Sequence, residues 1–168
     1  MLGLTIFPIL LLALMIDAVF GDPKPLYRIV PHPAQMMGWL IEQLDKQLNL
    51  EEADDKSKRL NGIITVIIVV GLAGGIGWGL ITLFSLIPYG WILEAILLST
   101  MIAGRSLYEH VAAVAKALKA EKIVEAREVA SQIVGRDTKF LDRHGVARAA
   151  IESLSENFSD GVLAPIFW

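Results

Sequence analysis

Two stretches of the chain are almost wholly apolar, whereas the remainder mixes apolar with charged positions. Residues 4–20 read LTIFPILLLALMIDAVF and contain only two polar residues, Thr5 and Asp17. Residues 61–87 contain no charged residue at all. Because a helix crosses the bilayer core with roughly 17–25 mostly apolar residues, both stretches predict uncleaved membrane helices.

A third apolar stretch follows a tight turn predicted at Pro88-Tyr89-Gly90. Its helical pattern starts at Trp91 and continues beyond the apolar residues into RSLYEHVAAVAKALKA. We predict one long helix that lies in the membrane over residues 91–110 and then enters the cytoplasm. Asp17 and Glu94 would be intramembrane acids and therefore functional candidates, although a capping or interfacial role explains each equally well.

The polar stretches, residues 21–60 and 111–161, predict helices of the soluble type. One helix is expected to begin near His32-Pro33, with Pro33 in its first turn, and to run to about Leu48. A second helix is expected to end at Gly135. Its apolar positions recur with helical period and predict packing against other helices: Leu118, Ile123, Ala126, Val129, Ala130 and Ile133. A third helix is expected from Leu141 to Phe158, closed by Asp160-Gly161.

Composition and charge set the class and the orientation. The 168 residues are 54% hydrophobic and include no cysteine, which excludes disulfides and thiol catalysis. The net charge of −3 is small and mixed, so nucleic acid is not expected as a partner. Lys and Arg occur only within residues 24–59 and 105–148. The positive-inside rule places both regions in the cytoplasm and the N-terminus outside.

The predicted fold class is therefore all-α: a multi-pass integral membrane protein of the cell (inner) membrane with cytoplasmic helical segments. We expect residues 1–168 to form a single membrane-embedded domain. The lipid bilayer is its first predicted partner, and the basic segments, residues 21–60 and 111–161, lie on the cytoplasmic side.

Candidate chemistry is concentrated in residues 135–161, GRDTKFLDRHGVARAAIESLSENFSDG. Arg148, Glu152 and Glu156 recur every four residues and share one helix face. Arg148 and Glu152 are suited to a surface ion pair, but Glu152 and Glu156 repel each other. A cation between them would remove that repulsion. Mg²⁺ prefers oxygen ligands and binds through one or two carboxylates together with substrate phosphates.

The residues alone thus suggest a cytoplasmic Mg²⁺–phosphate site. Its predicted members are Asp137, Glu152, Glu156, Asn157 and Asp160, and Arg136 or Arg148 would grip a phosphate directly. The alternative is a charged amphipathic helix on a membrane-proximal surface. The three histidines are far apart and form no metal-ligand motif.

A series of short motifs carries a family resemblance over the whole chain. It comprises Asp17, Phe20-Gly21-Asp22-Pro23, His32-Pro33, Gly38, Gly104-Arg105-Ser106-Leu107, Gly135-Arg136-Asp137-Thr138, Leu141-Asp142, Arg148-Ala149-Ala150, Ile151-Glu152-Ser153, Ser155-Glu156-Asn157, Ser159-Asp160-Gly161, Ala164-Pro165 and Phe167-Trp168. In this order and spacing they resemble the adenosylcobinamide-phosphate synthase family of cobalamin biosynthesis, the CbiB/CobD integral membrane proteins.

The resemblance implies an ATP-dependent carbon–nitrogen ligase. Such an enzyme joins (R)-1-amino-2-propanol O-2-phosphate to a carboxylate of adenosylcobyric acid, giving adenosylcobinamide phosphate, with Mg²⁺ and ATP as cosubstrate. Other late cobalamin-biosynthesis membrane enzymes are implied as partners. Members of this family are nearly twice as long, so we expect this chain to be an N-terminal portion of a longer fold. Two rivals are a non-catalytic membrane scaffold and a sensor related to the family.

The resemblance also implies roles for individual residues. Catalytic roles fall to Glu152, Glu156, Asp137 and Asp160, and metal binding to Asp137, Glu156 and Asp160. Either Glu156 or Asp137 would be the general base. Substrate-binding roles fall to Asp22, His32, Arg105, Arg136, Thr138, Arg148, Asn157 and Ser159.

Overall fold

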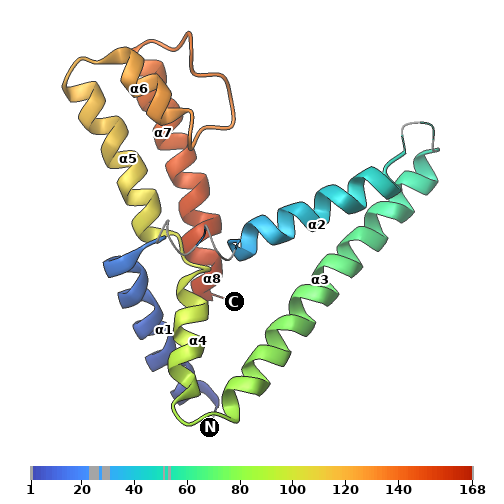
Figure 1. Ribbon diagram of the computed structural model, residues 1–168. Coiled ribbons are helices and arrows are strands. Elements are labelled where there is room, and N and C mark those ends of the chain that lie inside the picture. Colours follow the sequence, from blue (N-terminus) through green and yellow to red (C-terminus); the bar gives the residue numbers. More distant parts are fainter. Residues whose placement is uncertain (1, 23–26, 28–30, 51, 53, 168) are drawn as a thin grey trace. The chain divides into compact units, whose positions relative to one another are not determined.

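The computed structural model describes residues 2–22, 27, 31–50, 52 and 54–167, and these residues form helices and turns without strands (Figure 1). The predicted all-α class is confirmed for this part of the chain. The chain divides into two compact units, one built from residues 1–23 and 96–168 and the other from residues 24–95. Each unit is described by itself.

In the unit of residues 24–95, two helices follow each other as a hairpin: they contact each other near their connection and diverge away from it (Figure 1). The first, α2 (Pro33–Leu48), begins as the sequence predicted, with Pro33 at its first position. His32 caps it, because its ring nitrogen Nδ1 accepts a 3.1 Å hydrogen bond from the backbone N–H of Ala34. The second, α3 (Asp55–Ser85), contains all but the end of the apolar stretch predicted as a membrane helix.

Helix α3 has no buried residue. Apart from adjacent residues and the nearby backbone of α3 itself, no atom of the described residues lies within 4 Å of the positions at which Gly71, Gly75 and Gly79 would carry a Cβ atom. The turn after α3 is tight, as predicted at Pro88-Tyr89-Gly90. A Cβ atom on Gly90 would lie 1.9 Å from the carbonyl oxygen of Phe84, so this position requires glycine.

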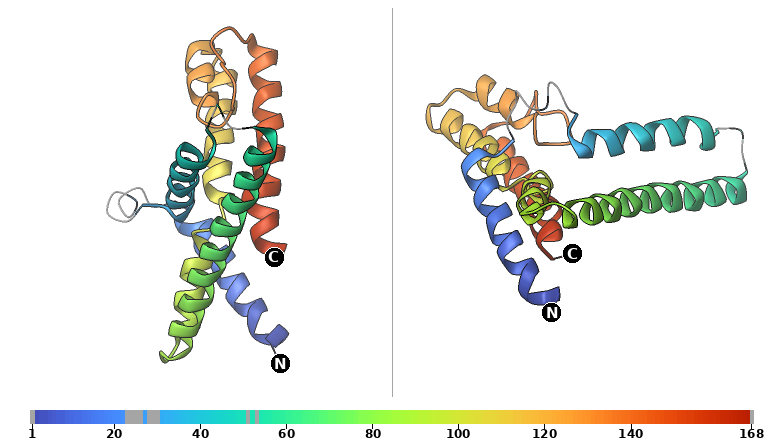
Figure 2. Two further views of the ribbon diagram at one scale, coloured as in Figure 1. Left: turned by 90° about the vertical axis from the view of Figure 1, so that its right-hand side faces the viewer. Right: turned by 60° about the horizontal axis from the view of Figure 1, so that its bottom comes forward.

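The other unit contains most of the remaining helices. They are α1 (Leu2–Phe20), α5 (Gly104–Lys119), α6 (Ile123–Ala130), α7 (Arg143–Phe158), the π-helix η2 (Ser159–Leu163) and α8 (Ala164–Phe167). Helix α4 (Gly90–Ser99) crosses the boundary between the units. Figures 1 and 2 both show α7 running beside α5, with α6 packed next to them.

A buried core joins α5, α6 and α7. Its members are Val114, Ala117, Ala126, Ala130, Val134, Val146, Ala149 and Ala150, with Leu118, Ile123, Val129, Ile133 and Leu141 packed against them. All six positions of the apolar face predicted between Leu118 and Ile133 lie in this cluster or against it. The prediction that this face packs against other helices is therefore confirmed.

The predicted continuous helix from residue 91 onward is wrong, because the chain breaks between α4 and α5. The hydroxyl groups of Ser99 and Thr100 donate to the carbonyl oxygens of Ile96 and Leu97, each at 2.7 Å, and so provide side-chain partners at the end of α4. The N–H of Ala103 donates instead to the carbonyl of Gly161, at 2.9 Å.

The helix predicted to end at Gly135 is likewise interrupted. After α5 the N–H groups of Glu121 and Lys122 donate to the carbonyls of Leu118 and Ala117, at 3.2 and 3.1 Å. Glu121 adopts a left-handed conformation with φ of +59°. This is the Schellman arrangement that ends many helices, and it allows α6 to fold back onto α5.

The helix predicted from about Leu141 to Phe158 is found as α7, but the predicted closure by Asp160-Gly161 is wrong. Helix α7 begins at Arg143, capped by Asp142, whose Oδ1 accepts a 2.7 Å hydrogen bond from the N–H of Gly145. Asp160-Gly161 does not close it. The chain continues through η2, where the N–H of Ala164 bonds to the carbonyl of Ser159, into α8.

Candidate functional site

The loop between α6 and α7 carries part of the predicted site and is anchored at its base. Thr138 is 3% exposed, and its hydroxyl donates a 2.9 Å hydrogen bond to the carbonyl of Arg127. In return, Nε of Arg127 donates to the carbonyl of Leu141, at 2.7 Å. The hydroxyl of Thr138, predicted to bind substrate, thus has a partner within the protein.

At the tip of this loop, Arg136 forms an ion pair with Glu152 of α7. The sequence suggested Arg148 as the partner of Glu152. Arg148 is exposed and has no ion pair among the described residues. Asp137 is also exposed, and its Oδ1 accepts a 2.9 Å hydrogen bond from the N–H of Lys139. The fold therefore brings Arg136 to the acidic face of α7, and Asp137 is the next residue of the same loop.

Exposed acids and amides continue along α7 and into η2. Glu152, Glu156 and Asp160 are all exposed, and the four-residue spacing of the two glutamates puts them on one side of α7. Asn157 donates from Nδ2 to the carbonyl of Ser153 at 2.8 Å, and Ser159 is exposed. No three His, Asp or Glu side chains within the described part of the chain form a ready metal-binding group. The metal assignments to Asp137, Glu156 and Asp160 stay predictions.

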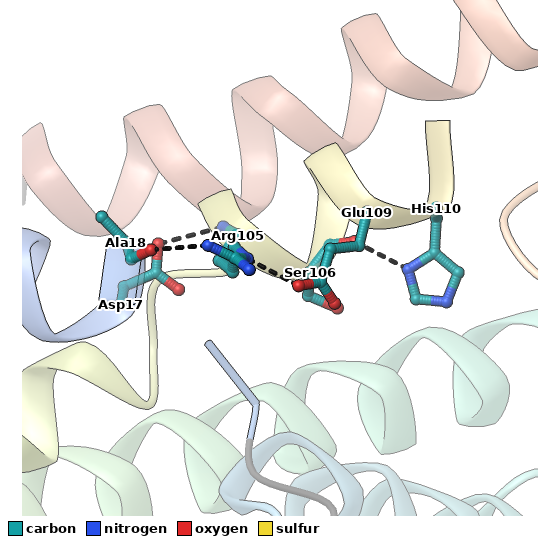
Figure 3. A network of polar contacts seen from close by, with 6 residues as sticks. All are labelled: Asp17, Ala18, Arg105, Ser106, Glu109 and His110. Carbon is teal, nitrogen blue, oxygen red and sulfur yellow. Dashed lines mark hydrogen bonds and ion pairs between the residues drawn. The ribbon is translucent and has the colours of Figure 1, made fainter. Parts of the chain in front are cut away.

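A second polar cluster joins α1 to the start of α5 (Figure 3). Asp17 is 6% exposed, and its Oδ2 accepts a 3.1 Å hydrogen bond from the backbone N–H of Arg105. In the opposite direction, Nη1 of Arg105 donates to the carbonyl of Ala18 at 3.1 Å. Each side chain satisfies backbone groups at the end of the other's helix. Of the two roles considered for Asp17, the structure shows the capping role.

This cluster leaves no room for larger side chains. Gly21 has a φ of +56°, and a Cβ atom there would lie 2.7 Å from Cγ of Arg105. A Cβ atom on Gly104 would lie 2.8 Å from Oδ2 of Asp17. Arg105 also forms an ion pair with Glu109, from Nε to Oε1 at 2.5 Å. The guanidinium of Arg105, predicted to bind substrate, is thus engaged within the protein.

Two further predicted residues lie at the margins of these clusters. Asp22 follows the end of α1 by two residues and is half-buried. His32 belongs to the other unit, where it caps α2 and its ring packs against Tyr27 at a centroid distance of 4.8 Å. The structure therefore places the predicted site residues in several groups, which sequence spacing alone did not reveal.

The connection between α5 and η2 is the feature that sequence reasoning missed. The N–H of Ala103 bonds to the carbonyl of Gly161, next to Asp160. A Cβ atom on Gly161 would lie 3.4 Å from that of Ala103, so the two backbones approach closely. Because backbone atoms form this contact, no pattern of side chains in the sequence predicts it.

Taken together, the α6–α7 loop and α7 present exposed carboxylates next to a guanidinium. Carboxylate oxygens suit Mg²⁺, and a guanidinium binds phosphate through paired hydrogen bonds. The two glutamates of α7, Glu152 and Glu156, are the carboxylates that the sequence prediction assigned to a cation with a phosphate-bearing ligand, and that assignment stays a prediction. The donor set therefore fits a magnesium ion that arrives with phosphate ligands, since such a site needs only one or two protein carboxylates.

Known proteins resemble this chain over nearly its full length. The sequence profile of the CobD/Cbib protein family matches residues 10–168. A protein from Sinorhizobium sp named "Cobalamin biosynthesis protein CobD" is 45% identical over 165 residues, which cover 98% of this chain and 51% of that protein. A protein of the same name from Rhodobacter capsulatus is 41% identical, over 95% of this chain and 50% of its own length. The chain spans about half the length of these curated relatives. No solved structure matches it significantly.

Proposed function

The chain belongs to the CobD/Cbib protein family, and on this premise we propose that it acts in cobalamin biosynthesis as part of adenosylcobinamide-phosphate synthase. In this proposal it joins (R)-1-amino-2-propanol O-2-phosphate to adenosylcobyric acid in an ATP-dependent reaction. The observation that carries the proposal is the exposed acidic face of α7 with Arg136 beside it, in a chain that matches this family from residue 10 to residue 168.

The reaction needs an activated acyl group, because amide formation from a free carboxylate is unfavourable in water. In the proposed first step, a carboxylate oxygen of the corrinoid attacks the γ-phosphorus of ATP, and ADP leaves. In the second step, the amine nitrogen attacks the acyl carbon, the C–N bond forms, and phosphate leaves with the C–O electron pair. A general base takes the proton from the amine, and Glu156 and Asp137 are the two candidates.

The proposed roles follow from charge and exposure. Asp137, Glu156 and Asp160 would hold Mg²⁺, which supplies charge neutralisation at the phosphates. Arg136 and Arg148 would bind phosphate oxygens. The guanidinium of Arg136 is ion-paired with the carboxylate of Glu152. An incoming phosphate would therefore have to compete with Glu152 for Arg136. Once displaced, the Glu152 carboxylate would be available to the same cation as Glu156.

We also propose that the chain spans the cell membrane. Helix α3, residues 55–85, is long and apolar enough to do so, with a mean hydropathy of 2.3. Residues 90–119, which comprise α4, the break after it and α5, also meet the criteria of length and composition, with a mean hydropathy of 1.2. In the most apolar part of α3, no residue is buried against other residues of the described chain. Apolar side chains on every side of a helix are typical of a helix that is surrounded by lipid or by other apolar helices. The basic segments and the proposed site would lie on the cytoplasmic side.

The decisive experiment is turnover by the purified chain in proteoliposomes. Adenosylcobyric acid, aminopropanol phosphate, Mg²⁺ and ATP are supplied, and adenosylcobinamide phosphate is measured by mass spectrometry. Glu156→Gln removes a proposed metal ligand, so we expect it to abolish product. A matched control is Glu128→Gln, on α6, which removes an exposed carboxylate outside the proposed site.

The same assay is repeated with the remaining half of a full-length relative co-expressed. Product only under this condition would support the family reaction and assign the missing function to the other half. No product under either condition would contradict the ligase proposal. Corrinoid binding without turnover would then favour the non-catalytic scaffold.

A further inference from the structure

The N-terminal turn of α5 is held from two sides. On one side Asp17 accepts the hydrogen bond from the N–H of Arg105, and on the other side Ala103 donates to the carbonyl of Gly161. The donors are only two residues apart, so α1, α5 and η2 meet at a single point. We refer to Asp17, Ala103, Gly104, Arg105 and Gly161 as the α5 junction.

The carbonyl of Gly161 belongs to the π-helix η2. In η2 the N–H of Ala164 bonds to the carbonyl five residues back, that of Ser159. This wider turn departs from the hydrogen-bond pattern of the α-helix. The carbonyl of Gly161, within the turn, accepts from Ala103 of a different helix. The position of Asp160, the adjacent residue, is therefore tied by the backbone to the start of α5.

We infer that Asp17 is a positioning residue for the proposed Mg²⁺–phosphate site. Its buried carboxylate fixes the first turn of α5, that turn fixes the Gly161 carbonyl, and Gly161 fixes Asp160 at the end of the acidic face of α7. Asp17 touches neither metal nor substrate in this scheme. The inference rests on the proposed function, and it extends the support of that site to the first helix of the chain.

Gly104, the first residue of α5, offers a second way to disturb the contact to Asp17. At Gly104 a methyl group would lie 2.8 Å from Oδ2 of Asp17 and would push the carboxylate away. Alanine has a higher helix propensity than glycine, so it is not expected to disfavour the first turn of α5 through helix propensity. Gly104→Ala thus disturbs the contact to Asp17 while the Asp17 side chain itself is retained.

The test measures Mn²⁺ binding, as a stand-in for Mg²⁺, by electron paramagnetic resonance on the whole chain in detergent. Removing a group that is hydrogen-bonded directly to a metal ligand weakens binding by roughly 10–100-fold. Asp17 acts through the backbone of α5 and Gly161, so we expect Asp17→Ala to weaken binding at the lower end of that range, by roughly 10-fold. Asn caps helices about as well as Asp, so Asp17→Asn is expected to retain most of the affinity. Gly104→Ala is expected to weaken binding in the same direction as Asp17→Ala.

The matched control is Asp142→Ala. Asp142 is also a helix-capping carboxylate, with a 2.7 Å hydrogen bond to Gly145, but it caps the opposite end of α7. We expect a comparable decrease in melting temperature and unchanged Mn²⁺ affinity. If Asp17 acted only by stabilising the fold, Asp17→Ala and Asp142→Ala would change the Mn²⁺ affinity equally. Hydrogen exchange at the Ala103 amide gives a second readout, which should accelerate in Asp17→Ala and not in Asp142→Ala.

The outcomes separate the two proposals. Wild-type affinity in folded Asp17→Ala, or equal losses in Asp17→Ala and Asp142→Ala, would overturn the role of Asp17 and leave the metal site standing. If Asp17→Ala does not fold, the Mn²⁺ affinity of Gly104→Ala is measured instead. Wild-type Mn²⁺ affinity in Gly104→Ala would also overturn the role of Asp17. No Mn²⁺ binding by the wild-type chain would contradict the proposed site itself and, with it, this inference.

Discussion

Apolar side chains are buried in one region of the molecule and exposed in another. They are buried in the core formed by α5, α6 and α7, and they are exposed on α3 in the hairpin with α2. In the first, Val146 is fully buried and small residues such as Ala126 allow the helices to approach closely. In the second, α3 is more apolar than α5, α6 or α7, yet its Val70 and Ile67 side chains are 64% and 65% exposed. A one-sided apolar face is thus satisfied within the chain, whereas a helix that is apolar all round needs an apolar environment outside it.

The largest effect is expected where burial is complete. Val146→Asp would place an unpaired carboxylate in the core and lower the free energy of unfolding by about 3–5 kcal/mol. The control is Val124→Asp in α6, at a side chain that is 73% exposed, for which we expect a change within about 0.5 kcal/mol. Thermal unfolding followed by circular dichroism measures both. Equal effects would show that α5, α6 and α7 do not form the core of this unit.

A somewhat smaller effect is expected in α3, where the measured quantity is membrane insertion and not the free energy of unfolding. An arginine near the centre of a membrane helix opposes insertion by roughly 2.5–3.5 kcal/mol, so Val70→Arg should reduce the inserted fraction in a glycosylation-reporter assay. Gln47→Arg, at an exposed position of α2, should leave insertion unchanged. Wild-type insertion of Val70→Arg would argue against lipid around α3.

The smallest effect is expected at the ion pair between Arg136 and Glu152. Both side chains are more than half exposed, and exposed pairs contribute only about 0.2–1 kcal/mol. Arg136→Gln should therefore lower the free energy of unfolding within this range, with a smaller loss at high salt because salt screens the pair. Arg148→Gln is the comparison, since no ion pair of Arg148 occurs within the described residues. A larger, salt-independent loss in Arg136→Gln would mean that Arg136 serves packing.

Patterns of local origin were predictable from the sequence. The start of α2 at Pro33 follows from the fixed φ of proline and from its missing N–H, which costs nothing in the first turn. The apolar face between Leu118 and Ile133 follows from its helical period. The helix predicted from about Leu141 to Phe158 is found as α7, which starts two residues later, at Arg143. These features depend only on residues that are close in sequence.

The errors concern contacts between distant residues or backbone groups. The break before α5 depends on a bond from Ala103 to Gly161, and the end of α7 depends on a π-turn held by that bond. The turn at Glu121 places a residue with a Cβ atom where glycine is the usual signal. For the candidate site, helical spacing placed Glu152 and Glu156 together, but the approach of Arg136 depends on how the loop folds back onto α7.

The hydrogen bond between Asp17 and Arg105 also affects the order in which the protein folds during synthesis. The two residues are separated by 88 positions in the chain. At the usual synthesis rate of 5–20 residues per second, Arg105 is added roughly 4–18 s after Asp17. During that interval the carboxylate has to remain hydrated or find a temporary partner. The first helix of the chain therefore reaches its final place only after the beginning of α5 has left the ribosome.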